Sequence, residues 1–159
     1  MIVTFRRFQR PAYSDGVIDL YPVWRGLAPD DDMGFGDVYD YVITEHGRKR
    51  EIGRVEARLG EGLCCYYFGH VGYHIDPPWR GHHYALRACR LIAPVFRRAG
   101  KRSAVITCDP DNTPSRKTCE ELGCVLERTV KVPARVRERW EISREKHRFI
   151  WVLEEETGG

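Results

Sequence analysis

The sequence lacks a long apolar run, since no stretch approaches the roughly 18 consecutive apolar residues of a membrane-spanning helix. It also lacks a strong excess of charge, because 26 basic and 23 acidic residues leave a formal net charge of +3. This balance gives no reason to expect a nucleic acid or an anionic membrane as a partner. Residues 1–14 contain no apolar region of the secretory type, and we therefore expect a cytoplasmic protein.

The six cysteines form neither a Cys-x-x-Cys pair nor the spacing of a disulfide framework. We interpret them as free, partly buried thiols. His70 and His74 suggest a metal site, but four residues along a strand span roughly 13 Å, which is too far for two ligands of one ion. We therefore expect no metal.

The length and composition predict one globular domain over residues 1–159, because 159 residues with 42% hydrophobic content can bury a core. We expect the leader, 1–14, and the tail, 154–159, to be poorly ordered. Alternating or short apolar segments predict strands at 16–24, 38–44, 51–59, 63–75, 102–108, 125–132 and 147–153.

The segment 134–146 interleaves arginines with glutamates, which favours a solvated helix or long loop. The alternative is a nucleic-acid-binding segment over 134–148, whose affinity would fall steeply with salt. The segment 25–37 is rich in Gly, Pro and Asp and leaves room for little more than a helical turn.

The stretch from His70 to Ala99 organises the chain. Apolar residues alternate up to Ile75, as in a strand. Pro77 and Pro78 lack backbone N–H groups and cannot continue the hydrogen bonding of a sheet, so the strand should end before them. From Ala85 onward apolar residues recur at helical spacing, so a helix should begin near 81–83.

A phosphate cradle is expected where this helix begins. Unpaired N–H groups at a helix start carry partial positive charge. Arg80 adds a cation there, and Gly81 allows a ligand to approach the backbone. Alternatively, Gly81 serves only a tight turn.

This turn resembles the Q/R-x-x-G-x-G/A signature of the GNAT acetyltransferases. Pro78 stands at the Q/R place, Gly81 fits the first Gly, and His83 replaces the second. An imidazole at this helix start could itself bond a phosphate.

A second segment, 109–124, resembles the family pattern N-x-x-A/S-x-x-x-Y-x-x-x-G-F. Asn112, Ser115 and Gly123 fit the pattern, while Cys119 and Cys124 replace Tyr and Phe. Asn112 could also serve only as a helix cap. The resemblance covers about residues 52–130.

The resemblance implies an α+β fold with a mixed, mostly antiparallel central sheet of about six to seven strands and helices on both faces. The sheet would splay between the strands ending at Ile75 and Cys108, with the pantetheine arm of CoA in the gap. The implied activity is acetyl transfer from acetyl-CoA, as co-substrate, to a primary amine of a small molecule or protein, by a monomer or homodimer. The alternative is a non-catalytic acyl-CoA-binding regulatory module, which the missing Tyr and altered second Gly favour.

The resemblance also implies site residues. The cofactor-binding set is Tyr73, His74, Ile75, Arg80, Gly81, His82, His83, Tyr84, Asn112, Ser115 and Cys119. His70 is the first choice for the general base, with His74 and Glu56 as alternatives, and backbone N–H groups over 73–75 would hold the oxyanion.

The leaving thiolate lacks the family's Tyr, because Cys119 is too short to reach the sulfur directly. We expect Cys119 to pack near the pantetheine end, and water or a tyrosine such as Tyr66 or Tyr67 to donate the proton. An acidic cluster in and near the segment 25–37 predicts an acceptor with positive charge. The alternative is that these residues only form a solvated loop. The cluster consists of Asp30, Asp31, Asp32, Asp37 and Asp40.

Overall fold

The structure is a computed structural model of the 159-residue chain, and it describes residues 10–26 and 34–154. Its elements follow one another as β1 (Tyr13–Ser14), β2 (Ile18–Gly26), β3 (Val38–Glu45), β4 (Gly53–Arg58), α1 (Leu63–Phe68), β5 (Val71–Ile75), the 3-10 turn η1 (Pro77–Trp79), α2 (Tyr84–Arg98), β6 (Ser103–Cys108), α3 (Thr113–Glu121), β7 (Val125–Lys131), α4 (Ala134–Arg139) and β8 (Glu145–Val152). The predicted α+β fold is confirmed. No helix of the described residues is long and apolar enough to cross a membrane.

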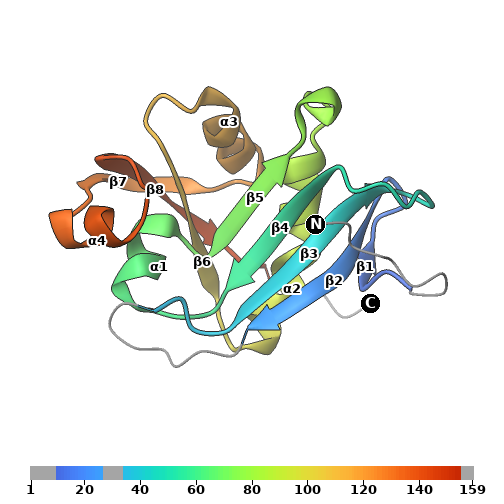
Figure 1. The fold of residues 1–159 in the computed structure, drawn as a ribbon, viewed down its shortest axis with the longest axis horizontal. Helices are drawn as coiled ribbons and strands as arrows, with labels where there is room; N and C mark the ends of the chain where they lie inside the picture. Colours follow the sequence, from blue (N-terminus) through green and yellow to red (C-terminus); the bar gives the residue numbers. More distant parts are fainter. Residues whose placement is uncertain (1–9, 27–33, 155–159) are drawn as a thin grey trace.

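The strands form two antiparallel sheets. A five-stranded sheet has the order β1-β2-β3-β4-β5, and a three-stranded sheet has the order β6-β8-β7 (Figure 1). Tyr13 and Ser14, within the leader for which we expected poor order, pair with Leu20 and Asp19 of β2. The Tyr13 ring also packs edge-on against Tyr41, with 5.8 Å between the ring centroids. Residues 1–9 and 155–159 lie outside the described part.

Strand β4 shows how the five-stranded sheet divides its faces. Val55 and Ala57 are buried in the core that α2 covers, while Arg54, Glu56 and Arg58 alternate with them and lie on the opposite face. The sheet therefore has one apolar face, which α2 covers, and one polar face. On the polar face, β4 contributes basic and acidic side chains.

The predicted strand over 63–75 is wrong in its first half. Leu63–Phe68 forms helix α1, and only Val71–Ile75 forms strand β5. Periodicity cannot separate a short buried strand from a short buried helix in such an apolar run, and Gly69, at φ +80, breaks the chain between the two.

The two sheets meet beside His70. An isolated bridge links Gly69 with Ile106, and the His70 N–H donates to the Val105 carbonyl at 2.7 Å. The Val105 N–H donates to Nδ1 of His70 at 2.9 Å, so the proton lies on Nε2, which donates to the Gly60 carbonyl at 3.1 Å. His70 is only 6% exposed, and it therefore acts as a buried clamp between the sheets. Beyond this bridge, β5 and β6 belong to different sheets.

We expect His70→Ala to lower the free energy of unfolding by about 2–4 kcal/mol, because it leaves the Val105 N–H and the Gly60 carbonyl buried without these partners. Urea unfolding measures this loss. The matched control is His74→Ala, whose side chain is 62% exposed and should change stability by less than about 0.5 kcal/mol. Equal effects of the two substitutions would contradict the clamp.

The clamp also predicts a pH dependence. Burial is the largest influence on the pKa of His70 and lowers it below the ordinary 6.5. The negative charge of Glu61 acts in the opposite direction and raises the pKa. Below about pH 6.5 the His70 side chain is protonated in the unfolded chain but stays neutral in the folded chain. The stabilisation by His70 is therefore complete above that pH and is lost as the pH falls. The stability difference between the parent and His70→Ala should therefore shrink from about pH 8 to about pH 5. A constant difference across that range would oppose this assignment.

Candidate active site and cofactor cleft

A cleft of about 820 Å³ opens where β5 and β6 part. One wall consists of β5, the turn η1 and the first residues of α2, and the other consists of the end of β6 and helix α3. In Figure 1, α3 lies beside the end of β5. Residues of α3 and the first residues of α2 both line the cleft. The two segments that resemble the family motifs thus face each other.

Most of the predicted cofactor-binding residues line this cleft. They are Tyr73, His74, Ile75, Arg80, Gly81, His83, Tyr84, Asn112 and Ser115. His82 and Cys119 do not line it: His82 is exposed and packs on the Tyr84 ring at 5.4 Å, while Cys119 has no exposed surface.

The turn before α2 is held by Arg80, whose Nε donates to the Ile75 carbonyl at 2.8 Å. Gly81 follows at φ +89, with no atom within 4 Å of the place where a Cβ would stand. Helix α2 begins at Tyr84, directly after the predicted start. Its first N–H groups face the exposed turn, as a phosphate cradle requires.

His83 adopts a strained backbone at this turn. It is the only non-glycine with positive φ in the described residues, with φ 60 and ψ 25, and it stands where the family pattern has Gly. Its Nδ1 lies 3.0 Å from Oε2 of Glu121, and both side chains line the cleft. The substitution therefore keeps the left-handed backbone of a glycine and adds an imidazole that links α2 to α3.

The opposite wall begins with a capped helix. Oδ1 of Asn112 accepts a hydrogen bond from the Ser115 N–H at 3.2 Å, which confirms the capping role. Asn112 also lines the cleft, so capping does not exclude contact with a ligand. Across the cleft, the Tyr73 hydroxyl lies 2.7 Å from Oγ of Ser115.

Cys119 lies one turn below Ser115 in a buried group of thiols. It is grouped with Cys89, Cys108 and Cys124, and hydrogen bonding to Cys124, followed by burial, raises the pKa of the Cys119 thiol. All six cysteines keep their thiol groups and five of them are buried, as predicted. The described residues contain no cluster of three or more His, Cys, Asp or Glu that could hold a metal ion.

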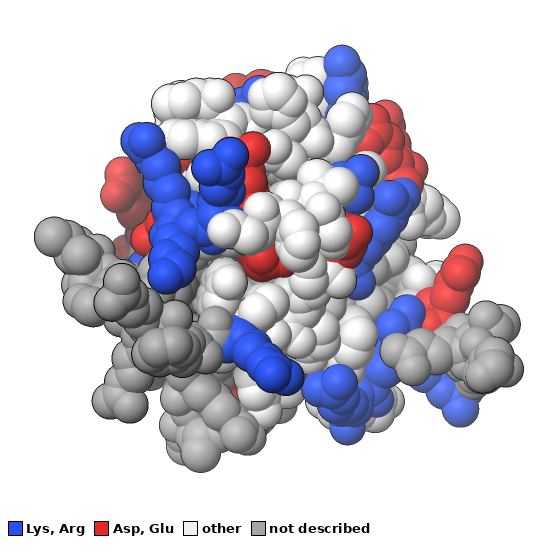
Figure 2. Space-filling view, turned by 90° about the vertical axis from the view of Figure 1, so that its right-hand side faces the viewer, with Lys and Arg blue, Asp and Glu red and all other residues white. Residues whose placement is uncertain are grey.

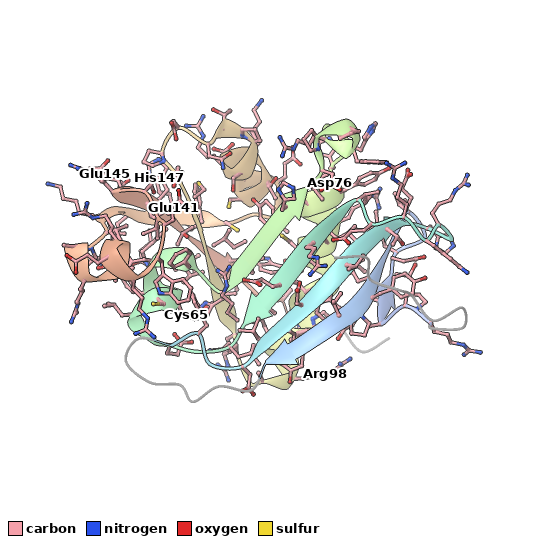
Figure 3. All side chains as sticks on the ribbon, viewed as in Figure 1. Cys65, Asp76, Arg98, Glu141, Glu145 and His147 are labelled. Carbon is pink, nitrogen blue, oxygen red and sulfur yellow. The ribbon has the colours of Figure 1, made fainter. Side chains whose placement is uncertain are left out.

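The three candidate bases differ in access. His70 does not line the cleft, and both of its ring nitrogens bond backbone groups in the clamp, so its placement does not suit the expected role of general base. His74 is exposed and lies on β5, with Nε2 3.3 Å from Oδ1 of Asp76. Figure 3 shows Asp76 at the end of β5. Glu56 does not line the cleft either, but it stands opposite Gly72, which does line it, on the polar face of the sheet.

Arg58 and Gly72 were missed by sequence reasoning. Nε of Arg58 donates to Oε1 of Glu56 at 2.5 Å, and Nη1 donates to the carbonyls of Phe68 and Gly69 at 3.1 Å each. A Cβ at Gly72 would lie only 2.6 Å from Nη2 of Arg58. Glycine within a strand was the available signal, because it often marks a close approach.

The fold and the cleft define a class of protein: an acyl-CoA-binding transferase fold, with a sheet splayed between two strands beside the start of a helix. The family model described as "Acetyltransferase (GNAT) domain" matches residues 6–125. The chain therefore belongs to the GNAT acetyltransferase family.

Solved structures agree in fold. The ribosomal-protein-S5-alanine acetyltransferase from Vibrio fischeri is 20% identical, with a TM-score of 0.57 over 76% of this chain and 64% of that one. Mycobacterium smegmatis RimJ in complex with CoA-disulfide is 20% identical, with a TM-score of 0.57 over 76% and 56%. The microcin C7 self immunity acetyltransferase MccE, in complex with acetyl-CoA and AMP, is 16% identical, with a TM-score of 0.54 over 73% and 61%. This chain thus spans less than two thirds of each of these proteins, and no curated protein matches it.

Proposed function

We propose that the chain is an acetyl-CoA-dependent N-acetyltransferase that acts on a primary amine of a small molecule or a protein. The observation that carries this proposal is the cleft of about 820 Å³, where residues of both motifs converge from β5, α2 and α3. Among the similar structures, one is named for an acceptor, the alanine of ribosomal protein S5, and another contains acetyl-CoA.

The proposed pose follows the polarity of the cleft. The pyrophosphate lies against the Arg80–Tyr84 turn. This turn combines the N–H groups at the start of α2, the Arg80 guanidinium and Gly81, which has no side chain to block a ligand. The pantetheine arm runs between β5 and β6. Because β5 is the edge strand of its sheet, alternate backbone groups point into that gap, and N–H groups over 73–75 hold the oxyanion.

We assign the general base to Glu56 rather than His70. An alkyl ammonium with a pKa of about 10 must lose a proton before attack. The Glu56 carboxylate is fixed through Oε1 by Arg58, and it flanks Gly72, the one bare position of β5 on the cleft wall. It accepts the proton through a water molecule.

The acceptor remains defined only by its amine. Asp40 lies opposite Glu56 on the same face, where it pairs with Arg54 at 3.2 Å and burial raises the pKa of its carboxyl group. The cationic acceptor therefore rests on the sequence prediction. Asp30, Asp31 and Asp32 lie outside the described residues. We further propose a cytoplasmic monomer or homodimer with neither metal nor nucleic acid as ligand. Figure 2 supports the last point for the face it shows, since blue Lys and Arg are interspersed with red Asp and Glu among the described residues.

The second candidate is a non-catalytic acyl-CoA-binding module, which His83 and Cys119 at two motif positions favour. Thioester consumption with a panel of primary amines separates the two candidates. Turnover with any amine supports the transferase. Tight acetyl-CoA binding without turnover across the panel supports the module.

We expect Glu56→Gln to lower kcat by about 100-fold, the size typical of removing a general base, with acetyl-CoA affinity unchanged. The control is Glu51→Gln, since Glu51 also binds an arginine, Arg54 at 2.7 Å, but stands away from Gly72. Steady-state rates and calorimetric binding measure the two effects. A parental kcat in the glutamine variant would show that another group removes the proton.

We expect Glu121→Gln to tighten CoA binding by about 3- to 10-fold at low salt, because it removes a carboxylate beside the proposed pyrophosphate site and frees His83 to bond phosphate. Titration calorimetry measures the affinity. Glu120→Gln is the matched control, since Glu120 pairs with Arg116 at 3.7 Å and does not line the cleft. If both variants bind CoA equally, Glu121 does not face the pyrophosphate.

A further inference from the structure

The hydroxyl pair Tyr73–Ser115 lies inside the cleft, and the mechanism above leaves it unused. The Tyr73 side chain extends from β5 to α3, where its hydroxyl lies 2.7 Å from Oγ of Ser115. Both residues line the cleft, and Ser115 is only 9% exposed. A chain inserted between β5 and β6 therefore passes next to this pair.

The surroundings keep the Tyr73 hydroxyl protonated. Burial is the largest cause that raises its pKa, followed by the nearby Cys89 thiol. The partner is also fixed in place, because the Ser115 N–H donates to Asn112 at the start of α3. The phenol is thus an immobilised O–H donor with little rotational freedom to lose when it meets an acceptor.

The donors that the sequence suggested for the sulfur lie elsewhere. Tyr66 and Tyr67 belong to α1 and do not line the cleft, and neither does the fully buried Cys119. Tyr84 lines the cleft, but its hydroxyl donates to Oε2 of Glu45 at 2.9 Å, at the turn end of β3. Among the described tyrosines, only Tyr73 points its hydroxyl from the cleft wall toward α3.

We propose that the Tyr73 hydroxyl donates a hydrogen bond to the CoA sulfur and stabilises the thiolate that leaves during acetyl transfer. This rests on the proposed function. The amine nitrogen forms the new C–N bond, and the electron pair of the breaking C–S bond goes to sulfur. Glu56 takes the first proton of the ammonium through water before attack, and the second proton, which nitrogen loses as the amide forms, passes to bulk water. The Tyr73 O–H donates to the sulfur while its oxygen can accept from the Ser115 hydroxyl, and CoA leaves as a thiolate or takes a proton from water.

A binding experiment tests this without any acceptor. CoA and desulfo-CoA differ by the sulfur, and raising the pH to about 9.5, above the pKa of about 8.5 of a cysteine thiol, increases the thiolate fraction of CoA. The parent should bind CoA about 10-fold more tightly than desulfo-CoA at that pH, the order expected for one charge-assisted hydrogen bond, and Tyr73→Phe should remove most of this preference. Tyr67→Phe is the control and should keep it.

Ser115→Ala decides between the two hydroxyls. It should retain the preference for CoA, because the phenol still supplies the donor. If Ser115→Ala loses the preference while Tyr73→Phe keeps it, the serine is the donor and the proposal is wrong. Equal preference in the parent and Tyr73→Phe also overturns it. Far-ultraviolet circular dichroism and the melting temperature confirm that each variant is folded.

Turnover supplies the second readout. With an amine that the parent accepts, Tyr73→Phe should lower kcat by about 10- to 100-fold, while the KM for acetyl-CoA stays within about 2-fold. A kcat equal to the parent's contradicts the role. If the parent binds CoA but acetylates no amine, the proposed transferase function fails, and the CoA to desulfo-CoA ratio still tests Tyr73.

Discussion

The buried imidazole of His70 is the interaction on which the cleft depends. It bonds the backbone of Val105 on β6 and of Gly60 after β4, and it stands next to the single bridge between the two sheets. A sheet that continued past this point would pair β5 with β6 along their length and close the gap. Because the join is confined to this one point, the strands part directly beyond it and leave a cleft between them.

The position of this join decides which residues can meet. β5 becomes an edge strand with backbone groups directed into the gap, and the helices that follow β5 and β6 both begin at the open end. The Arg80 turn and the Asn112 cap therefore face each other, although 32 positions separate them in the sequence. Such an arrangement can hold an extended ligand with a charged end at the helix starts and its reactive end near the join.

The sequence predicted the parts that short-range patterns determine. Strand β5, the start of α2 and the Asn112 cap follow from alternation, helical spacing and a polar residue before a proline. Helix α1 could not be recognised, because a six-residue apolar run between glycines fits a strand equally well. The role of His70 was also beyond sequence reasoning, since its partners Gly60 and Val105 are brought to it only by the packing of two sheets. The same holds for the contact between Tyr73 and Ser115, 42 residues apart.

The two departures from the family motifs have different physical consequences. At His83 the backbone remains that of a glycine, so the geometry of the turn is preserved at the cost of strain, and the added imidazole reaches Glu121. At Cys119 the side chain is withdrawn completely into the thiol group beneath α3. The Tyr73 hydroxyl instead reaches Ser115 of the same helix from β5. A hydroxyl group can thus reach the cleft from a strand instead of a helix, because a hydrogen bond depends on the position of the donor atom and not on the element that carries it.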